Sequence, residues 1–557
     1  MYTLQIEEFA KRNKYILIFF GIGIIYILNL FIDVMDVDAA QYASISMEMS
    51  QNGSYLEVYH LGGDYLDKPP LHFWLSSLSM SLFGINNFAY KFPSFLLALL
   101  SIYSTYRFSR LYYSKNISVI AAAVLASTQA LFTMTNDVRT DTILQAFVIF
   151  SVWQLAAFVK LNQWKNLILG FIGIAFAMMA KGPIGAVTPI IAIGFDFLLK
   201  RQWKMIFNWK WLIGILIVAV LLIPLTYGLY TQFDLHPEKT AYGIKRPSGV
   251  RFFYWTQSFG RITGESDWQN DSSFFYFFHT ILWDFQPWVL FLLLGLINTV
   301  RSFFYRTSDK FKEYRLEYIS FGGFFLAFLA LSMSHYKLPH YIFITFPFAA
   351  VITARFLLSI EKSKLLEWVQ IFFNSLFWII LIIGSILFFP PEHWILALIF
   401  IILLICWFAI LFRTKITWQK IFFPTIVASF AFNLNLSANF YPQLIGKYQG
   451  SSNAAKTFYK EQKGKGELFL YQAHDHTLDF YNQQIVLRKS IEELKELSSN
   501  HWVYTNSEGY RTVLNEKLPF EIVHEFPDYP VTQLSIPFLY KETRATTLDT
   551  VYLIKHR

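Results

Sequence analysis

The sequence predicts an α-helical polytopic membrane protein followed by a small C-terminal α/β soluble domain, and three observations support this prediction. Of the 557 residues, 55% are hydrophobic and only 15% are charged, and the mean hydropathy is +0.38. This composition excludes an ordinary soluble enzyme and a disordered chain. Apolar runs follow one another up to residue 437, where the sequence becomes lysine-rich and polar. We therefore expect a transmembrane domain over residues 1–437 and a soluble domain over residues 438–557.

Thirteen apolar runs are predicted to cross the membrane, although some are shorter than the roughly 20 residues that a span requires. They lie near residues 15–32, 88–106, 116–134, 142–159, 166–180, 183–199, 211–230, 276–300, 318–334, 341–358, 367–389, 394–412 and 421–437. Lys11, Arg12 and Lys14 precede the first run, and no small-residue cleavage signature follows it. This arrangement predicts an uncleaved signal-anchor helix with a cytoplasmic N-terminus.

The distribution of basic residues supports this topology. The formal charge of +9 does not predict nucleic-acid binding, because most Lys and Arg residues occur in short groups between apolar runs. An odd number of spans places the C-terminal domain outside. The short loops that would then face the cytoplasm hold about half of the 47 Lys and Arg residues, and the outside loops hold far fewer, as the positive-inside rule requires.

Four polar connections fall on the predicted outer face. They are residues 33–87, the turn Thr135–Asp141, residues 231–275 and the segment Ser334–His340. Connections that gather on one side of a helical bundle are a common way to build a binding site. We therefore expect the functional residues to come from these four connections.

The first of these connections, residues 33–87, contains two helix-like segments. Tyr42–Met49 and Pro70–Phe83 carry apolar residues at helical spacing but are too short and too polar to cross a membrane. We expect both to lie along the membrane interface and to cover a cavity that opens to lipid.

The tail alternates between patterns typical of strands and of helices. Strand-like runs cover Glu467–Tyr471, Gln484–Leu487, Trp502–Thr505 and Glu521–Phe526, and a helix-like run covers Lys489–Ser499. These runs predict a small α/β domain outside the membrane.

Three acidic residues stand next to the predicted spans. Asp36 and Asp38 follow the first span, and Asp141 begins the fourth. A carboxylate in such a place can act as a general base toward a hydroxyl group, or hold a divalent cation against a phosphate. The alternative is that Asp141 caps a helix, with Thr140 as a rival cap, and that the other two are solvated loop residues.

Lys68 is a cation on a stiffened turn. Pro69 and Pro70 follow it, and a proline fixes its own φ and biases the preceding residue toward extended geometry. A lysine held in this way could neutralise the phosphate of a lipid. The alternative is an ordinary lysine that extends its side chain to the interface.

These residues belong to motifs that resemble a known superfamily. The run "DVDAAQYASISMEMSQNGSYLEVYHLGGDYLDKPPLHFWLSSLSMSLFGINNFAYKFPS" is similar to the first periplasmic loop of the protein mannosyltransferase and lipid A aminoarabinose transferase (ArnT) families. Both belong to the GT-C superfamily of polyprenyl-phosphate-sugar glycosyltransferases. The resemblance covers roughly the first 350 residues through four further motifs: Thr140–Leu144, Ala180–Pro183, Phe259–Ile262 and Lys337–Tyr341.

The resemblance implies roles for individual residues. The family's catalytic carboxylate falls on Asp38, its second active-site aspartate on Asp141 and its phosphate-binding lysine on Lys68. Three further donor-site positions fall on Tyr65, Arg261 and Tyr341.

The chain also departs from the family pattern at four positions. These are Ala39 and Asp67, where the family has glutamate, Gln41 in place of an arginine, and Ser258 near a histidine of the aminoarabinose branch. The absence of this arginine and this histidine argues against lipid A and aminoarabinose as substrates.

The resemblance implies a GT-C fold and a sugar transfer at the periplasmic face of a bacterial inner membrane. The donor would be an undecaprenyl-phosphate sugar whose phosphate meets Lys68, with help from Arg261, Lys181 or Lys337, and the acceptor would be a lipid, a glycan or a protein. Asp38 would deprotonate the acceptor hydroxyl in a displacement that inverts the anomeric centre. Asp141 would orient the acceptor, or Asp36, Asp38 and Asp141 would hold a divalent metal. No organic cofactor is expected.

Two other classes of function remain as alternatives. A transporter or flippase of a lipid-linked sugar would also need many spans and a lateral opening, but it should place its charges near the bilayer midplane, often in two related halves. No such repeat is visible in the sequence. A non-catalytic assembly protein for envelope polysaccharide is the other alternative.

Overall fold

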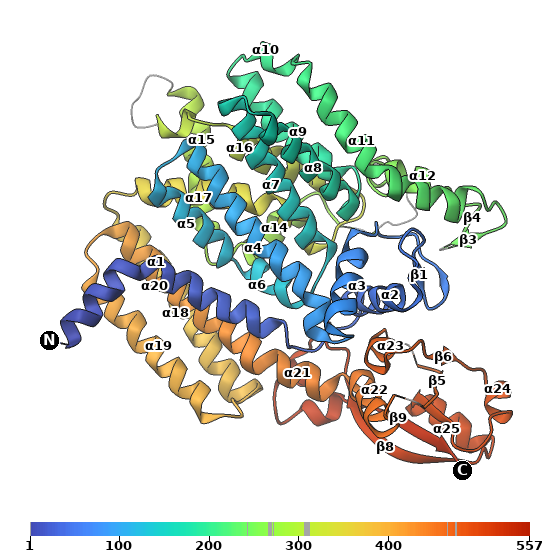
Figure 1. The fold of residues 1–557 in the computed structure, drawn as a ribbon. Coiled ribbons are helices and arrows are strands. Elements are labelled where there is room, and N and C mark those ends of the chain that lie inside the picture. The colour runs from blue at the N-terminus through green and yellow to red at the C-terminus, as the bar shows by residue number, and fades with distance from the viewer. Residues whose placement is uncertain are drawn as a thin grey trace.

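The computed structural model describes residues 2–241, 243–265, 270, 272–305, 312–464, 466–473 and 476–557, and it shows a large helical body with a smaller C-terminal region that contains a sheet (Figure 1). Each of the thirteen predicted apolar runs falls on helical structure. The helices are α1 (Tyr2–Asn29), α4 (Asn87–Tyr112), α5 (Lys115–Ala126) with α6 (Gln129–Asn136), α7 (Thr140–Leu161), α8 (Trp164–Lys181), α9 (Ile184–Leu199), α11 (Lys210–Leu229), α14 (Tyr276–Asp284) with α15 (Val289–Phe304), α16 (Ile319–Ser332), α17 (Phe346–Ser359), α18 (Lys364–Ile383), α19 (Trp394–Arg413) and α20 (Thr417–Asn435).

The chain is a multi-pass membrane protein. Among the described residues, 7 helices are long and apolar enough to cross a membrane, or up to 8 if the bent pair α5–α6 counts as one span. Four shorter apolar helices accompany them. The total of thirteen spans therefore stays a prediction.

Two predicted runs are interrupted. The axis bends by 52° between α5 and α6, where the Thr128 side chain accepts a hydrogen bond from the Leu131 backbone N–H and starts a new helix. The run predicted over residues 276–300 is also divided, because α14 ends at Asp284 and α15 begins only at Val289, after Pro287. A proline cannot donate a backbone hydrogen bond inside a helix, so this run is not one continuous helix.

The first long connection contains helices α2 (Asp38–Asn52) and α3 (Leu71–Phe83), with the hairpin β1 (Tyr59–His60) and β2 (Gly63–Asp64) between them. Both helices cover the segments that the sequence predicts. On α3, Leu78 and Leu82 are exposed, as expected for an interfacial helix. On α2, ten of the 15 residues are buried, because α3 packs on one side and helix α23 (Thr477–Asn482) of the C-terminal region packs on another (Figure 1). Helix α2 is therefore packed within the protein, and its position along the membrane interface stays a prediction.

His72 on α3 gives the protein a predicted response to pH. Its ring is fully buried among Tyr42, Phe73 and Tyr90, and neither ring nitrogen has a hydrogen-bond partner in the described part of the chain. Burial lowers the pKa of His72 to about 3, whereas in the unfolded chain it is about 6.5. Between these two values the unfolded chain binds a proton that the folded chain does not. Stability should therefore fall as the pH falls, by about 1.4 kcal/mol per pH unit.

We expect the unfolding temperature of the detergent-purified protein to decrease between pH 6.5 and pH 5, and the variant His72→Phe to show a smaller decrease. The measurement is a thermal unfolding series over this pH range. Equal slopes for the two proteins would show that His72 does not cause the effect.

The C-terminal region contains one five-stranded sheet in the described part of the chain, in the order β6-β5-β7-β9-β8. Strand β5 runs parallel to β6 and β7, and β9 runs antiparallel to β7 and β8. The strands are β5 (Leu468–Tyr471), β6 (Leu487–Arg488), β7 (Trp502–Asn506), β8 (Phe520–Asp528) and β9 (Asp549–His556), and the helices are α21 (Tyr441–Tyr448), α22 (Gly450–Glu461), α24 (Ile491–Lys495), α25 (Ser507–Asn515) and α26 (Ile536–Leu539).

The strands predicted at residues 467–471, 502–505 and 521–526 coincide with β5, β7 and β8, whereas the strand predicted at residues 484–487 meets β6 only at Leu487. Strand β9 was not predicted, and α24 is shorter than the helix expected over residues 489–499. The helical segment that begins with α20 continues to Tyr448, so the domain boundary predicted at residue 437 falls inside it and stays a prediction.

The C-terminal region packs against the segment that leads into α2. The Val34 backbone N–H donates to the Tyr481 hydroxyl at 2.7 Å, and Lys456 forms an ion pair with Asp33 at 2.5 Å. The Gln449 side chain accepts from the Asp36 backbone N–H and donates to the Val34 carbonyl oxygen, both at 3.0 Å. The chain just before Asp38 is therefore held by residues from far along the sequence.

The remaining short elements connect the long helices. They are α10 (Trp203–Ile206), β3 (Thr240–Ala241), β4 (Ile244–Lys245), α12 (Gly249–Arg251), α13 (Gly260–Thr263) and the 3-10 helix η5 (Pro339–Thr345).

Candidate active site

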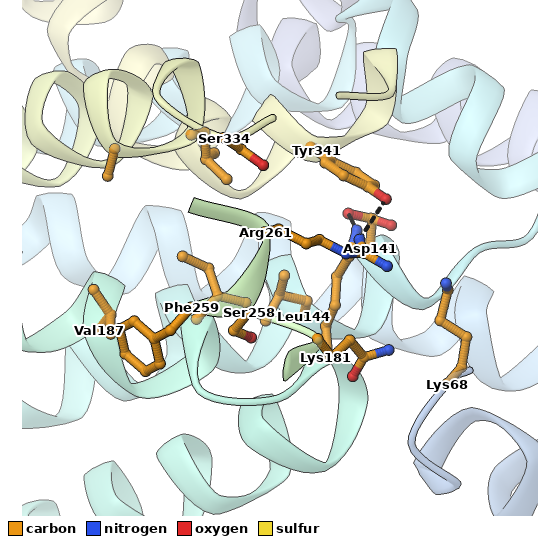
Figure 2. Close-up of a pocket in the computed structure, with 14 residues that line it drawn as sticks. Lys68, Asp141, Leu144, Lys181, Val187, Ser258, Phe259, Arg261, Ser334 and Tyr341 are labelled. Carbon is orange, nitrogen blue, oxygen red and sulfur yellow. Dashed lines mark hydrogen bonds and ion pairs between the residues drawn. The ribbon is translucent and has the colours of Figure 1, made fainter. Parts of the chain in front are cut away.

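Side chains from three distant parts of the sequence bring positive charge to one cavity. Among the described residues, the cations that line it are Lys68, Lys181 and Arg261 (Figure 2), and its volume is about 120 Å³. Lys68 lies just before α3, Lys181 is the last residue of α8, and Arg261 lies on α13. We call this space the cation-lined cavity. Its lining suits an anion.

Acidic and phenolic groups position these cations. Lys181 Nζ lies 2.5 Å from Asp141 Oδ1, and Arg261 Nη1 donates to the Tyr341 hydroxyl at 3.0 Å (Figure 2). Lys68 Nζ lies 2.6 Å from Asp67 Oδ2. The lining itself holds three cations and one carboxylate, Asp141, in the described chain. It therefore keeps an excess of positive charge.

The other walls of the cation-lined cavity are mostly apolar. They are formed by Leu144, Ile184, Val187, Phe259, Ala330 and Leu331, from helices α7, α9 and α16 and from the chain before α13. A cationic end next to an apolar wall fits a molecule with an anionic head and a hydrocarbon tail.

Gly182 allows Lys181 to stand at the end of α8. The φ of Gly182 is +78°, a region that other residues rarely adopt, and a Cβ at this position would lie 3.3 Å from Ser258 Oγ. The glycine of the Ala180–Pro183 motif therefore lets the chain turn sharply from α8 into α9 beside the cavity.

Asp38 lines a second cavity, of about 390 Å³, which we call the Asp38 cavity. Asp38 lies in the first turn of α2 and forms an ion pair with Arg139, which also pairs with Asp137 at 2.8 Å. Burial lowers the pKa of Arg139, but the carboxylates of Asp137 and Asp38 raise it by more. The guanidinium therefore stays charged and holds the Asp38 carboxylate in place.

The two cavities are neighbours. His340 lines the Asp38 cavity, and its Nε2 lies 3.7 Å from Asp141 Oδ2 in the lining of the other. Burial raises the pKa of Tyr42 well above its ordinary value, and the carboxylates of Asp38 and Asp67 raise it further. The Tyr42 hydroxyl therefore lies within electrostatic range of Asp38 and of Asp67, which pairs with Lys68.

The structure brings most of the predicted site residues together. Lys68, Asp141, Lys181, Arg261 and Tyr341 line the cation-lined cavity. Tyr65 is buried and lines an adjoining cavity together with Lys68.

Two predicted residues lie elsewhere. Lys337 is buried outside the linings of both cavities, and its Nζ donates to the Ser272 carbonyl oxygen at 3.0 Å. Asp36 also lies outside both linings. In the described chain, no three His, Cys, Asp or Glu side chains form a group that could hold a metal ion, so Asp36, Asp38 and Asp141 do not form one.

Sequence reasoning missed three charged residues of the Asp38 cavity: Asp137, Arg139 and Asp284. Two of them lie in the turn Thr135–Asp141, which the topology places on the outer face. Its clustered charges were the available signal. Asp284 lies inside a run that was expected to be one continuous span, and a carboxylate within a span was itself the available signal.

The structure thus defines a multi-pass helical membrane protein with a cationic cavity beside an acidic one. Comparison with known proteins makes this assignment of protein class more specific. The family described as "Dolichyl-phosphate-mannose-protein mannosyltransferase" matches residues 67–227. A relative from Wigglesworthia glossinidia brevipalpis, named "Undecaprenyl phosphate-alpha-4-amino-4-deoxy-L-arabinose arabinosyl transferase", is 29% identical over 369 residues, which are 64% of this chain and 61% of that protein. A relative of the same name from Edwardsiella ictaluri is 27% identical over 59% of this chain and 57% of its own length.

The fold agrees with these matches. The crystal structure of ArnT from Cupriavidus metallidurans bound to undecaprenyl phosphate superposes with a TM-score of 0.72 over 97% of both chains, at 15% sequence identity. These findings confirm the predicted resemblance to ArnT-like proteins of the GT-C superfamily. The chain spans about three fifths of the length of the curated relatives that it matches.

Proposed function

We propose that the protein is a glycosyltransferase that moves a sugar from a polyprenyl-phosphate donor to an acceptor hydroxyl at the periplasmic face of a bacterial inner membrane. One observation carries this proposal: Lys68, Lys181 and Arg261 line one cavity whose other walls are mostly apolar. The relatives named as undecaprenyl-phosphate-dependent transferases and the fold shared with ArnT support it.

The donor binds with its phosphate among the three cations and with its isoprenoid chain against the apolar wall. Positive charge in a site with little water stabilises the negative charge that develops on the leaving phosphate, and such preorganised electrostatic stabilisation is usually the largest catalytic contribution. Asp141 and Tyr341 hold Lys181 and Arg261 in position through the contacts described above.

The acceptor binds in the Asp38 cavity. Asp38 removes the proton from the acceptor hydroxyl, and the oxygen attacks the anomeric carbon while the bond from that carbon to the phosphate oxygen breaks. The sugar becomes attached to the acceptor with inverted configuration, and the polyprenyl phosphate leaves. Arg139 orients the Asp38 carboxylate throughout.

Mass spectrometry of envelope lipids and glycoproteins, from cells with and without the gene, tests this function. We expect one sugar mass to disappear from one class of molecule when the gene is absent. A flippase would give a different result in vitro, because the purified protein would return the sugar still attached to the polyprenyl phosphate. An unchanged envelope, together with no transfer by the purified protein, would contradict the proposal.

A further inference from the structure

We propose that the acceptor group is an uncharged, polyhydroxylated one, namely a hydroxyl of a neutral sugar in a glycan, and not a phosphate. This inference deepens the proposed function, on which it rests. It follows from the charges and contacts of the Asp38 cavity, where the acceptor hydroxyl must approach its base.

The two cavities carry opposite charge. The described lining of the Asp38 cavity contains three carboxylates, Asp38, Asp137 and Asp284, and one guanidinium, that of Arg139. Even with Asp284 left out of the count, the carboxylates outnumber the arginine. The cation-lined cavity has the reverse balance. A phosphate would be attracted to the cation-lined cavity and repelled from the other, because like charges in a partly dehydrated site interact strongly.

Arg139 does not offset this balance for an incoming anion. Its Nε and Nη1 already contact Asp137 and Asp38. An acceptor phosphate could therefore reach only the guanidinium donors that these carboxylates leave unused, and it would then lie beside both carboxylates, which repel it.

Asp284 is available to bind a hydroxyl donor. In the described chain its Oδ2 is buried and has no hydrogen-bond partner, and the residue stands at the end of α14 in the wall of the Asp38 cavity. A buried carboxyl group accepts hydrogen bonds when it is ionised and can donate one when it is protonated. A sugar hydroxyl both donates and accepts, so it satisfies either form.

The other walls suit a sugar ring as well. Apolar surface for the C–H face of a ring comes from Met134, Pro339 and Phe343. A hydroxyl group comes from Thr532, which belongs to the C-terminal region. A pocket with apolar walls and a few placed polar groups is the usual form of a site for a small organic group.

The linkage of the product tests this inference. Purified protein is incubated with undecaprenyl-phosphate sugar labelled with ¹³C and with membranes from cells that lack the gene. We expect a product that resists mild acid and shows no ¹³C–³¹P coupling by NMR, because the sugar is bound through a carbon-borne oxygen. A product that is labile to mild acid and shows that coupling would be a glycosyl phosphate and would overturn both the inference and the acceptor hydroxyl of the proposed function. A product that mild alkaline β-elimination releases from protein would carry the sugar on Ser or Thr and would overturn the inference alone. Absence of any transfer would instead overturn the proposed function.

Asp284→Asn tests the residue that the inference assigns to the acceptor. We expect the KM for the acceptor, supplied as those membranes, to rise about tenfold, with the KM for the donor and the unfolding temperature unchanged. Asp549→Asn, an exposed aspartate on β9, is the matched control. A rise in the donor KM alone would mean that the cavity holds the donor's sugar, and no change in either KM would mean that Asp284 does not contact the acceptor. Either result would overturn the assignment.

Discussion

Replacing Asp38 by asparagine is expected to reduce the rate of sugar transfer by about 10²–10⁴-fold, the usual contribution of a general base. The amide has nearly the same shape as the carboxylate, but it cannot accept the proton of the acceptor hydroxyl. Because Asp38 lies outside the lining of the cation-lined cavity, the affinity for undecaprenyl phosphate should stay the same. The measurement combines single-turnover transfer in a reconstituted membrane with a binding titration of undecaprenyl phosphate.

This experiment distinguishes a loss of sugar transfer from a loss of affinity for the donor. Asp549→Asn on β9 is the control for a generic aspartate-to-asparagine change and should transfer at the normal rate. If Asp38→Asn transferred sugar at nearly the normal rate, another group would be the base. If it lost both transfer and donor affinity, Asp38 would belong to the donor site.

Replacing Lys68 by alanine should lower kcat/KM for the donor by about 10²–10³-fold, because a preorganised charge at the leaving phosphate is lost. Lys68 also pairs with Asp67, whose other oxygen lies 4.0 Å from Arg261, so the variant leaves Asp67 free to draw Arg261 away from the phosphate. The affinity for undecaprenyl phosphate should fall together with the rate. Titration of the purified protein with undecaprenyl phosphate and the transfer assay measure the two quantities.

Lys245→Ala is the matched control for this variant, because Lys245 is an exposed lysine on β4, outside the linings of both cavities. Lys68→Arg should restore part of the affinity, since it keeps the charge. Normal phosphate binding by Lys68→Ala would show that the phosphate does not meet this lysine, and the site would have to be assigned to Lys181 and Arg261 alone.

Hydrophobicity was sufficient to place the helices but not their interruptions. Apolar runs coincide with helices because a backbone in lipid must satisfy its own hydrogen bonds. The breaks at Thr128 and Pro287 depend on single residues within runs that remain apolar on average. The burial of α2 was not visible either, because Phe480 and its neighbours cover α2 from a region more than 400 positions away.

The cation-lined cavity could be predicted largely from motifs, since Lys68, Asp141, Lys181, Arg261 and Tyr341 each belong to a segment that resembles the family. The partners of Asp38 could not be predicted in this way. The ion pair between Asp38 and Arg139 joins residues 101 positions apart, and nothing in either local sequence indicates the other. For Lys337, a family-like motif suggests a phosphate contact, but its Nζ donates to the carbonyl oxygen of Ser272 and the residue lies outside both linings, so this contact stays a prediction.

The hydrogen bonds that join Tyr481 and Gln449 to residues 34 and 36 let the C-terminal region brace the chain that leads to Asp38. Lys181 instead stands at the end of the long helix α8, whereas Lys68 lies in the same connection between α1 and α4 as Asp38. Under the proposed mechanism, a protein shortened after Tyr448 would keep the ion pair between Asp38 and Arg139 but would lose this second support of its base.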